Sequence, residues 1–258
     1  MVSMLNLSER VALVTGGSRG LGRACALRLA EAGSDVVINY VSSKSAALET
    51  AKEIRNLGRR AFIVKADVSE EDDVRSMIAF IQEEIGQLDI VISNAATGGF
   101  RELLTAKVSN FKSAFHTNVL ALIFLVQAAM PLLEKSKVRG KVVAISSQGS
   151  SHAIPYYGFV GSSKAAMESI VRQLTLEIGD RGVNINVAKP GLLSTDSGRR
   201  LAGDYVDFDK LTETTQVGDR QLTPDDVANV VLFLSSPLSD LVQGEVIAVD
   251  GGSNFRVV

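Results

Sequence analysis

Residues 11–22 of the chain read VALVTGGSRGLG, and this stretch decides the fold. An apolar run leads into a turn whose glycines, Gly16, Gly20 and Gly22, are spaced G-x-x-x-G-x-G, and a helical pattern follows. Glycine permits a tight turn between a strand and a helix, and it lets a pyrophosphate approach the backbone at the positive end of the helix. The spacing alone is common, but its position between an apolar strand and a helix predicts a dinucleotide site. The other turn residues expected to contact the dinucleotide are Ser18, Arg19 and Leu21.

Short apolar runs alternate with helical patterns along the rest of the chain. Most of these runs are continuous, as expected for strands that are covered on both faces of a sheet. Strand–helix–strand repetition predicts parallel strands with right-handed crossovers. We therefore expect one α/β domain over 1–258, a Rossmann-like, doubly wound fold with a seven-stranded parallel sheet. The expected strands are 11–15, 36–39, 61–66, 90–93, 141–146, 184–188 and 246–249, and the expected helices are 20–32, 44–57, 71–85, 106–135, 158–179 and 225–235.

The end of the second strand bears on the type of dinucleotide. Sites for NAD usually place an acidic residue there, where it binds the ribose 2′-hydroxyl. Here Asn39, Tyr40 and Ser42 occupy this region without an acid, and Asp35 lies at the other end of the strand. Arg19 in the glycine turn could meet a 2′-phosphate, so NADPH is predicted over NADH, although Arg19 could also be a solvated loop charge.

The composition is that of an ordinary globular protein, with 46% hydrophobic residues, 22% charged residues and a net charge of −2. The charges form no long run of one sign, which argues against a nucleic-acid partner. We interpret the single cysteine, Cys25, as core packing, and two histidines with one cysteine predict no metal site. We interpret the longest apolar stretch, 119–130, as a buried helix, and we expect no window of about 18 residues to be apolar enough to span a bilayer. There is also no signal-peptide pattern, so we expect a soluble, cytoplasmic protein without a membrane partner.

The least regular region is the segment 192–222, which is rich in Thr, Asp, Gly and Arg. A long loop within a compact domain is more often a lid or a substrate loop than a plain connection. Its cations Arg199, Arg200 and Lys210 could receive an acidic carrier protein or a phosphate, or could form a solvated face.

Several short motifs together resemble the short-chain dehydrogenase/reductase family over essentially the whole chain. They are TGGSRGLG at 15–22, Asp67-Val68, Asn94-Ala95-Ala96, Pro190-Gly191 followed by Thr195, and VDGG at 249–252. The resemblance implies that Asp67 faces adenine, that the Asn94 segment supports the sheet beside the cofactor, and that Thr195 meets the nicotinamide carboxamide. It also implies that Asn118 holds a helix bend and a water next to the active-site lysine, and that the protein is a homotetramer with 106–135 and 158–179 at the interface.

The catalytic residues implied by the resemblance are Ser147, Tyr157, Lys164 and Asn118. Ordinary members of the family have Tyr-x-x-x-Lys, which would place the tyrosine at Val160. Here the tyrosine lies at Tyr157, giving Tyr-x6-Lys. Positions seven apart share a face of a helix, so the hydroxyl of Tyr157 is still expected to reach the nicotinamide. Tyr156 is the alternative, because adjacent helical residues cannot both face the cofactor.

The Tyr-x6-Lys spacing resembles the enoyl-acyl-carrier-protein reductases of this superfamily, and Ser147 makes the NADPH-dependent type III enzyme the nearest form. The resemblance implies reduction of the double bond of an enoyl thioester, carried on acyl carrier protein or coenzyme A. Two alternatives stay open: a ketoreductase or alcohol dehydrogenase of the same family, and a non-catalytic NADPH-binding protein.

Overall fold

The computed structural model describes residues 5–193, 195, 198–199, 215–217 and 220–255. Its centre is a seven-stranded sheet with the order β3-β2-β1-β4-β5-β6-β7, in which every neighbouring pair is parallel. The expected single α/β domain with a seven-stranded parallel sheet is thus confirmed. The strands are β1 Val11–Val14, β2 Asp35–Tyr40, β3 Ala61–Lys65, β4 Ile90–Ser93, β5 Gly140–Ile145, β6 Val183–Pro190 and β7 Val246–Val249.

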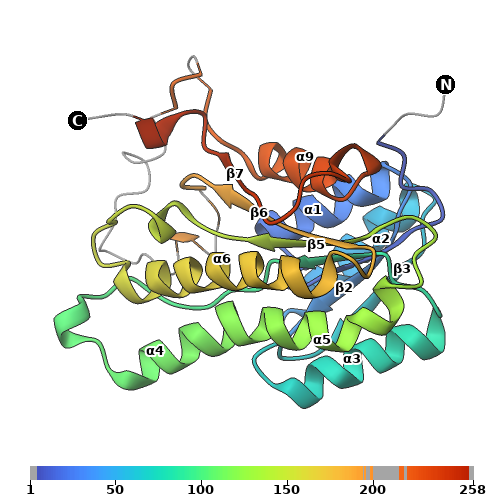
Figure 1. Cartoon of the computed structure of the whole chain (residues 1–258), viewed down its shortest axis with the longest axis horizontal. Helices are drawn as coiled ribbons and strands as arrows, with labels where there is room; N and C mark the ends of the chain where they lie inside the picture. The colour runs from blue at the N-terminus through green and yellow to red at the C-terminus, as the bar shows by residue number, and fades with distance from the viewer. Residues whose placement is uncertain (1–4, 194, 196–197, 200–214, 218–219, 256–258) are drawn as a thin grey trace.

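Helices cover both faces of the sheet, so the molecule has three layers (Figure 1). Helices α1, α2 and α9 lie on one face, and α3, α5 and α6 lie on the other. Because both faces are covered, the five inner strands are buried throughout, which explains their continuous apolar sequences, whereas the edge strands β3 and β7 are mostly only partly buried. The helices are α1 Gly20–Glu31, α2 Lys44–Asn56, α3 Glu71–Glu84, α4 Val108–Phe115, α5 Ala121–Leu133, α6 Gly158–Ile178 and α9 Pro224–Leu234.

The helix expected over 106–135 is divided in the structure. A π-helical turn, His116–Leu120, separates α4 from α5. The run Val108–Leu133 is long and apolar enough to cross a membrane, contrary to our expectation from the sequence that no such window exists. However, 56% of its most apolar window is buried within the molecule, as in a core helix.

The sheet brings the sequence motifs to one edge. Strand order reverses between β1 and β4, and a crevice at the carboxyl ends of the strands forms at such a reversal. The glycine turn follows β1, Asn94 follows β4, Ser147 follows β5 and Gly191 follows β6. Residues that are far apart in the sequence therefore meet at this edge.

Candidate active site

The glycine turn joins β1 to α1 in a conformation that other residues would not easily adopt. Gly16 has φ +61° and Gly20 has φ +55°, both in the left-handed region. A Cβ atom on Gly22 would lie 2.3 Å from the carbonyl oxygen of Gly16. The turn is therefore folded tightly against the start of α1, whose first N–H groups can donate hydrogen bonds to an anion.

Two asparagines hold this turn from neighbouring strands. Asn94 donates from Nδ2 to the carbonyl of Thr15 at 2.8 Å, and its backbone N–H donates to Thr15 Oγ1 at 2.9 Å. The N–H of Ala95 donates to the same hydroxyl at 3.0 Å. Asn94 and Ala95 thus link β4 to the turn, which agrees with the supporting role that the resemblance implies.

Asn39 holds the glycine turn from β2. Its side chain is almost completely buried, accepts from the N–H of Gly16 at 3.2 Å and donates to the carbonyl of Ala66 at 2.9 Å. Both ends of its amide are therefore bonded within the protein. Asn39 thus fixes the glycine turn to β2, and its expected contact with the cofactor stays a prediction.

The remaining residues expected near the adenosine end divide into buried and accessible ones. The side chain of Tyr40 packs in an apolar cluster and that of Val68 lies in the core, so their expected cofactor contacts stay predictions for the backbone at these positions. Asp67 is partly buried, and its carboxylate accepts from the N–H and hydroxyl of Ser69. Arg19 and Ser42 are exposed, whereas Ser18 is buried.

Lys164 lies inside the protein at the first turns of α6. Its ammonium group donates to the carbonyl of Ile145, at the end of β5, over 2.7 Å. Burial lowers the pKa of Lys164 to about 8, and the nearby carboxylate of Glu168 acts in the opposite direction. The lysine is thus a desolvated cation directly behind the segment that carries Ser147.

Tyr157 lies beside Ser147 but not within the helix. Tyr157 immediately precedes α6, with φ −102° and ψ 9°. Because it lies outside the helix, its position is not explained by a helical face shared with Lys164, as the spacing predicted. Its N–H donates to the carbonyl of Ile154 at 3.1 Å, and its ring packs 5.1 Å from that of Phe100. Burial raises the pKa of Tyr157, and interaction with the hydroxyl of Ser147 partly offsets this.

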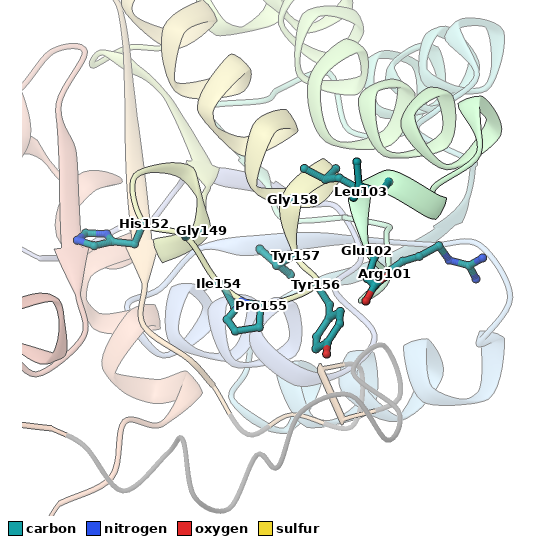
Figure 2. Close-up of a pocket in the computed structure, with 12 residues that line it drawn as sticks. Arg101, Glu102, Leu103, Gly149, His152, Ile154, Pro155, Tyr156, Tyr157 and Gly158 are labelled. Carbon is teal, nitrogen blue, oxygen red and sulfur yellow. The ribbon is translucent and has the colours of Figure 1, made fainter. Parts of the chain in front are cut away.

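The side chains of Tyr156 and Tyr157 point in different directions, so only one of them can enter the interior (Figure 2). Tyr156 has φ +62°, which is rare for a residue with a side chain, and it remains 38% exposed. This left-handed residue turns the chain immediately before Tyr157, so that the second tyrosine enters the interior.

Val160 fills the position at which the ordinary family tyrosine would stand. It is 5% exposed and packs with Phe159 and Ala114. A Cβ atom on Gly98 would lie only 2.3 Å from Cγ2 of Val160, so the loop after β4 is closed against this side chain. Position 160 therefore supplies no hydroxyl group to the site.

Asn118 lies in the π-helical turn between α4 and α5. Its Oδ1 accepts from the N–H of Thr97 at 3.0 Å, while Nδ2 donates to the carbonyl of Thr97 and to Ser163 Oγ. The expected helix bend is present, and the asparagine connects it to the residue before Lys164.

A cavity of about 600 Å³ opens next to Tyr157. Tyr157 and Gly149 lie on its wall, and Ile154, Pro155 and Leu103 make much of its lining apolar. His152 also lines it, with Nδ1 3.0 Å from Ser151 Oγ. An apolar cavity with a few polar groups is typical of a site for a small organic molecule.

The segment after β6 reaches the glycine turn. Pro190 ends β6, and Gly191 donates to the carbonyl of Val249 at 2.9 Å. The side chain of Thr195 lies beside Gly20, about 3.9 Å from where a Cβ of that glycine would be. Most of the expected substrate loop, including Arg200 and Lys210, lies outside the described residues.

These residues fit a nicotinamide dinucleotide. The left-handed glycines and the start of α1 suit a pyrophosphate, Arg19 is exposed at the end of this turn, and Thr195 closes over Gly20. Lys164 and Tyr157 then lie farther along the same edge of the sheet. The expected cofactor contacts of Ser42, Asp67 and Gly191 are compatible with this placement.

Sequence reasoning missed Glu168, Ser146 and Lys189, which form a buried polar cluster behind Ser147. It also missed Thr97 and Ser163, the partners of Asn118. The available signal was the position of Glu168 one helical turn after Lys164, on the buried face of α6.

Comparison with known proteins gives consistent relatives. The model of a family described as Enoyl-(Acyl carrier protein) reductase matches residues 16–254. A versicolorin reductase of Emericella nidulans is 33% identical, and the match covers 97% of both chains. The hydroxynaphthalene reductase-like protein Arp2 of Metarhizium majus is also 33% identical, over 96% of both chains.

Two solved structures illustrate the structural similarity. A 7α-hydroxysteroid dehydrogenase complexed with NADH and 7-oxo glycochenodeoxycholic acid is 29% identical with a TM-score of 0.89, and the match covers 96% of this chain and 95% of that chain. A short chain dehydrogenase from Burkholderia cenocepacia in complex with NADP is 31% identical with a TM-score of 0.87, covering 96% and 99%.

Proposed function

The chain belongs to the short-chain dehydrogenase/reductase family of nicotinamide-dependent oxidoreductases, and we propose that it uses NADPH to reduce a carbonyl group of a small cyclic or aromatic molecule. The observation that carries the proposal is the internal hydroxyl of Tyr157 beside that of Ser147, on the wall of a largely apolar cavity.

The preference for NADPH rests on charge. The end of β2 has no acidic side chain that would bind a ribose 2′-hydroxyl, and Asp35 at its start is paired with Arg59 and Arg60. Arg19 is the exposed cation of the glycine turn, where it suits a 2′-phosphate.

NADPH supplies a hydride when it is bound, and the side chains of the chain manage the oxygen and the proton. The raised pKa of Tyr157 keeps its hydroxyl protonated at neutral pH, which is the form that can donate. Ser147 can donate a second hydrogen bond to the same oxygen as negative charge develops on it. Asn118 secures the start of α6 around Ser163, and the cation of Lys164 on this helix would stabilise the tyrosine electrostatically as it gives up its proton.

Carbonyl reduction replaces enoyl reduction as the main proposal because of the relatives. The versicolorin and hydroxynaphthalene reductases match nearly the full length of the chain, and the 7α-hydroxysteroid dehydrogenase was solved with an oxo compound. Fused-ring molecules of this kind suit an apolar cavity of about 600 Å³.

Reduction of an enoyl thioester is the second candidate, favoured by one observation. The Tyr157-x6-Lys164 spacing departs from the ordinary Tyr-x-x-x-Lys, and the matched family model carries the description of an enoyl reductase. In that reaction the oxygen that gains charge is farther from the carbon that receives hydride than in a ketone, which gives a physical reason for moving the hydroxyl. The acyl group would be carried on acyl carrier protein or coenzyme A.

The test compares NADPH oxidation with 2-tetralone, a bicyclic ketone, and with a crotonyl thioester. We expect turnover of the ketone, loss of at least about 100-fold in Tyr157→Phe, and little change in the matched control Tyr156→Phe. Turnover of the crotonyl thioester alone would establish the second candidate. Binding of NADPH without turnover of either compound, or of a wider ketone panel, would contradict both and favour a non-catalytic protein.

The expected cytoplasmic location and homotetrameric assembly are part of this proposal. The apolar groove between α5 and α6, lined by residues such as Ile123, Met130 and Leu174, supports assembly.

A further inference from the structure

Glu168 is a buried carboxylate that the chemistry above does not use. It lies on α6 one turn after Lys164, and its side chain is 11% exposed. A charged side chain in such a place is costly unless it is paired and hydrogen-bonded. Its contacts therefore indicate what it holds in position.

The contacts of Glu168 come from both sides of Ser147. Its Oε1 accepts from the hydroxyl of Ser146, the preceding residue, at 2.5 Å, and from that of Ser150, three residues later, at 2.6 Å. One carboxylate oxygen thus ties both ends of the short turn that carries Ser147. Gln148 attaches the same turn elsewhere, since its Nε2 donates to Asp250 at 3.3 Å and to Ser253 at 2.7 Å. The hydroxyl of Ser147 itself accepts a long bond, 3.4 Å, from the N–H of Gly149.

A buried cation from β6 completes the cluster. Nζ of Lys189 lies 3.4 Å from Oε1 of Glu168 and 3.2 Å from the hydroxyl of Ser151, to which it donates. The carboxylate therefore connects three elements: helix α6, strand β6 and the turn after β5. Displacing it would release the hydroxyls of Ser146 and Ser150 and would leave Lys189 without this carboxylate.

We propose that Glu168 is a positioning residue, which holds the hydroxyl of Ser147 against that of Tyr157 by tethering both flanks of its turn. This inference assigns a further residue to the proposed function. Its tests by turnover depend on that function, whereas its test without substrate does not. Displacement of a group in an active site by about 1 Å can cost on the order of 100-fold in rate. Loss of Glu168 is therefore expected to lower kcat and to leave binding nearly intact.

The first test compares Glu168→Leu, which removes the acceptor, with Glu168→Gln, which retains one oxygen for both serines. We expect Glu168→Leu to lower kcat by roughly 10- to 100-fold with KM changed less than about 3-fold, and Glu168→Gln to recover most of the loss. The exposed Glu83→Leu on α3 is the control and should behave like the wild type. A loss confined to KM or to NADPH affinity, measured by fluorescence titration, would overturn the proposal.

Action through Ser147 is tested by a double-mutant cycle. In a Ser147→Ala background, Glu168→Leu should cause little further loss of kcat, because the hydroxyl that it positions is absent. An undiminished loss in that background would show a general structural role and overturn the proposal. If Glu168→Leu does not fold, the double variant Ser146→Ala/Ser150→Ala removes the same tethers and is expected to give the same non-additivity with Ser147→Ala.

A readout without substrate separates this inference from the proposed function. In protein labelled with 3-fluorotyrosine, the fluorine resonance of Tyr157 is identified by its loss in Tyr157→Phe. It should shift in Glu168→Leu, or in the serine double variant, in the same direction as in Ser147→Ala, while the resonance of Tyr156 stays in place. An unchanged Tyr157 resonance would refute the positioning role even if the ketone is reduced. The expected shift without any turnover would uphold it and leave the proposed reaction refuted.

Discussion

Because the ammonium group of Lys164 is buried, the free energy of unfolding of the free protein should depend on pH in a measurable way. Its pKa is about 8 in the folded chain, against an ordinary value of 10.5. Below pH 8 both states carry the charge, and burying it costs stability. Between pH 8 and 10.5 the unfolded chain binds more protons at this residue, so its contribution to the free energy of unfolding rises with pH.

We therefore expect Lys164→Met to be more stable than the wild type at pH 7, by about 1–2 kcal/mol after allowing for the hydrogen bond lost to Ile145. The difference should shrink as the pH rises from 8 to 10, and reduction should be abolished. Urea unfolding of both proteins across this range measures the difference. A difference in the free energy of unfolding that stays constant or grows with pH would contradict the conclusion that the charge of Lys164 is buried.

The backbone of Tyr156 leads to a second prediction at the same scale. Its φ of +62° costs a residue with a Cβ atom about 1 kcal/mol, which glycine avoids. Tyr156→Gly should thus be more stable than Tyr156→Ala by about 1 kcal/mol in thermal or chemical unfolding. The control pair Lys112→Gly and Lys112→Ala, at an exposed helical position, should show the opposite order, since glycine destabilises helices.

Individual residues of the candidate site could be predicted where a local rule acts. The glycines follow from the turn that they permit, and Ser147, Tyr157 and Lys164 follow from their spacing and its family resemblance. The helical argument for Tyr157 was wrong, because α6 begins one residue later and a left-handed Tyr156 sets the direction. The partners of Glu168 could not be predicted, since they come from separate elements that meet only in the folded sheet.

At the scale of elements, the start of α6 packs closely against the loop after β4. Val160 is buried there, and Gly98 leaves no room beside it. Val160→Tyr, which restores the ordinary family spacing, should lower the free energy of unfolding by about 1–3 kcal/mol through overpacking. The exposed Ser162→Tyr in the same turn should cost much less. Equal stability of the two variants in urea would show that the position accommodates a tyrosine.

The helices and strands themselves were largely predictable, because each has a period or an apolar run of its own. The break between α4 and α5 has no periodic signal and was implied only by the family resemblance, since Asn118 joins Thr97 and Ser163 from outside the helix to hold the π-helical turn. Tertiary hydrogen bonds of this kind leave no periodic trace in the sequence. The same reason explains why the hydrogen bonds of Asn39 to Gly16 and Ala66 could not be predicted.

At the scale of the whole molecule, the parallel sheet follows from the repeated strand–helix–strand order, and its reversal between β1 and β4 explains why four separate motifs meet. The assembly of several chains follows from no such rule. A groove lined by apolar side chains can belong to one chain or lie between two, and both cases require the same composition. The proposed homotetramer therefore has to be measured.

Light scattering after size exclusion should give a mass four times the 27.5 kDa of one chain. Leu176, on α6 beside the groove, is 80% exposed in the single chain, so Leu176→Glu should leave the fold of that chain intact. In an assembly that covers this face, the same change buries a carboxylate, which is costly, and the mass should fall toward that of smaller species. Leu57→Glu, at the end of α2 on the other side of the sheet, is the control and should retain the mass of the wild type. A monomeric wild type would refute the tetramer, and a tetramer indifferent to Leu176→Glu would place its interfaces elsewhere.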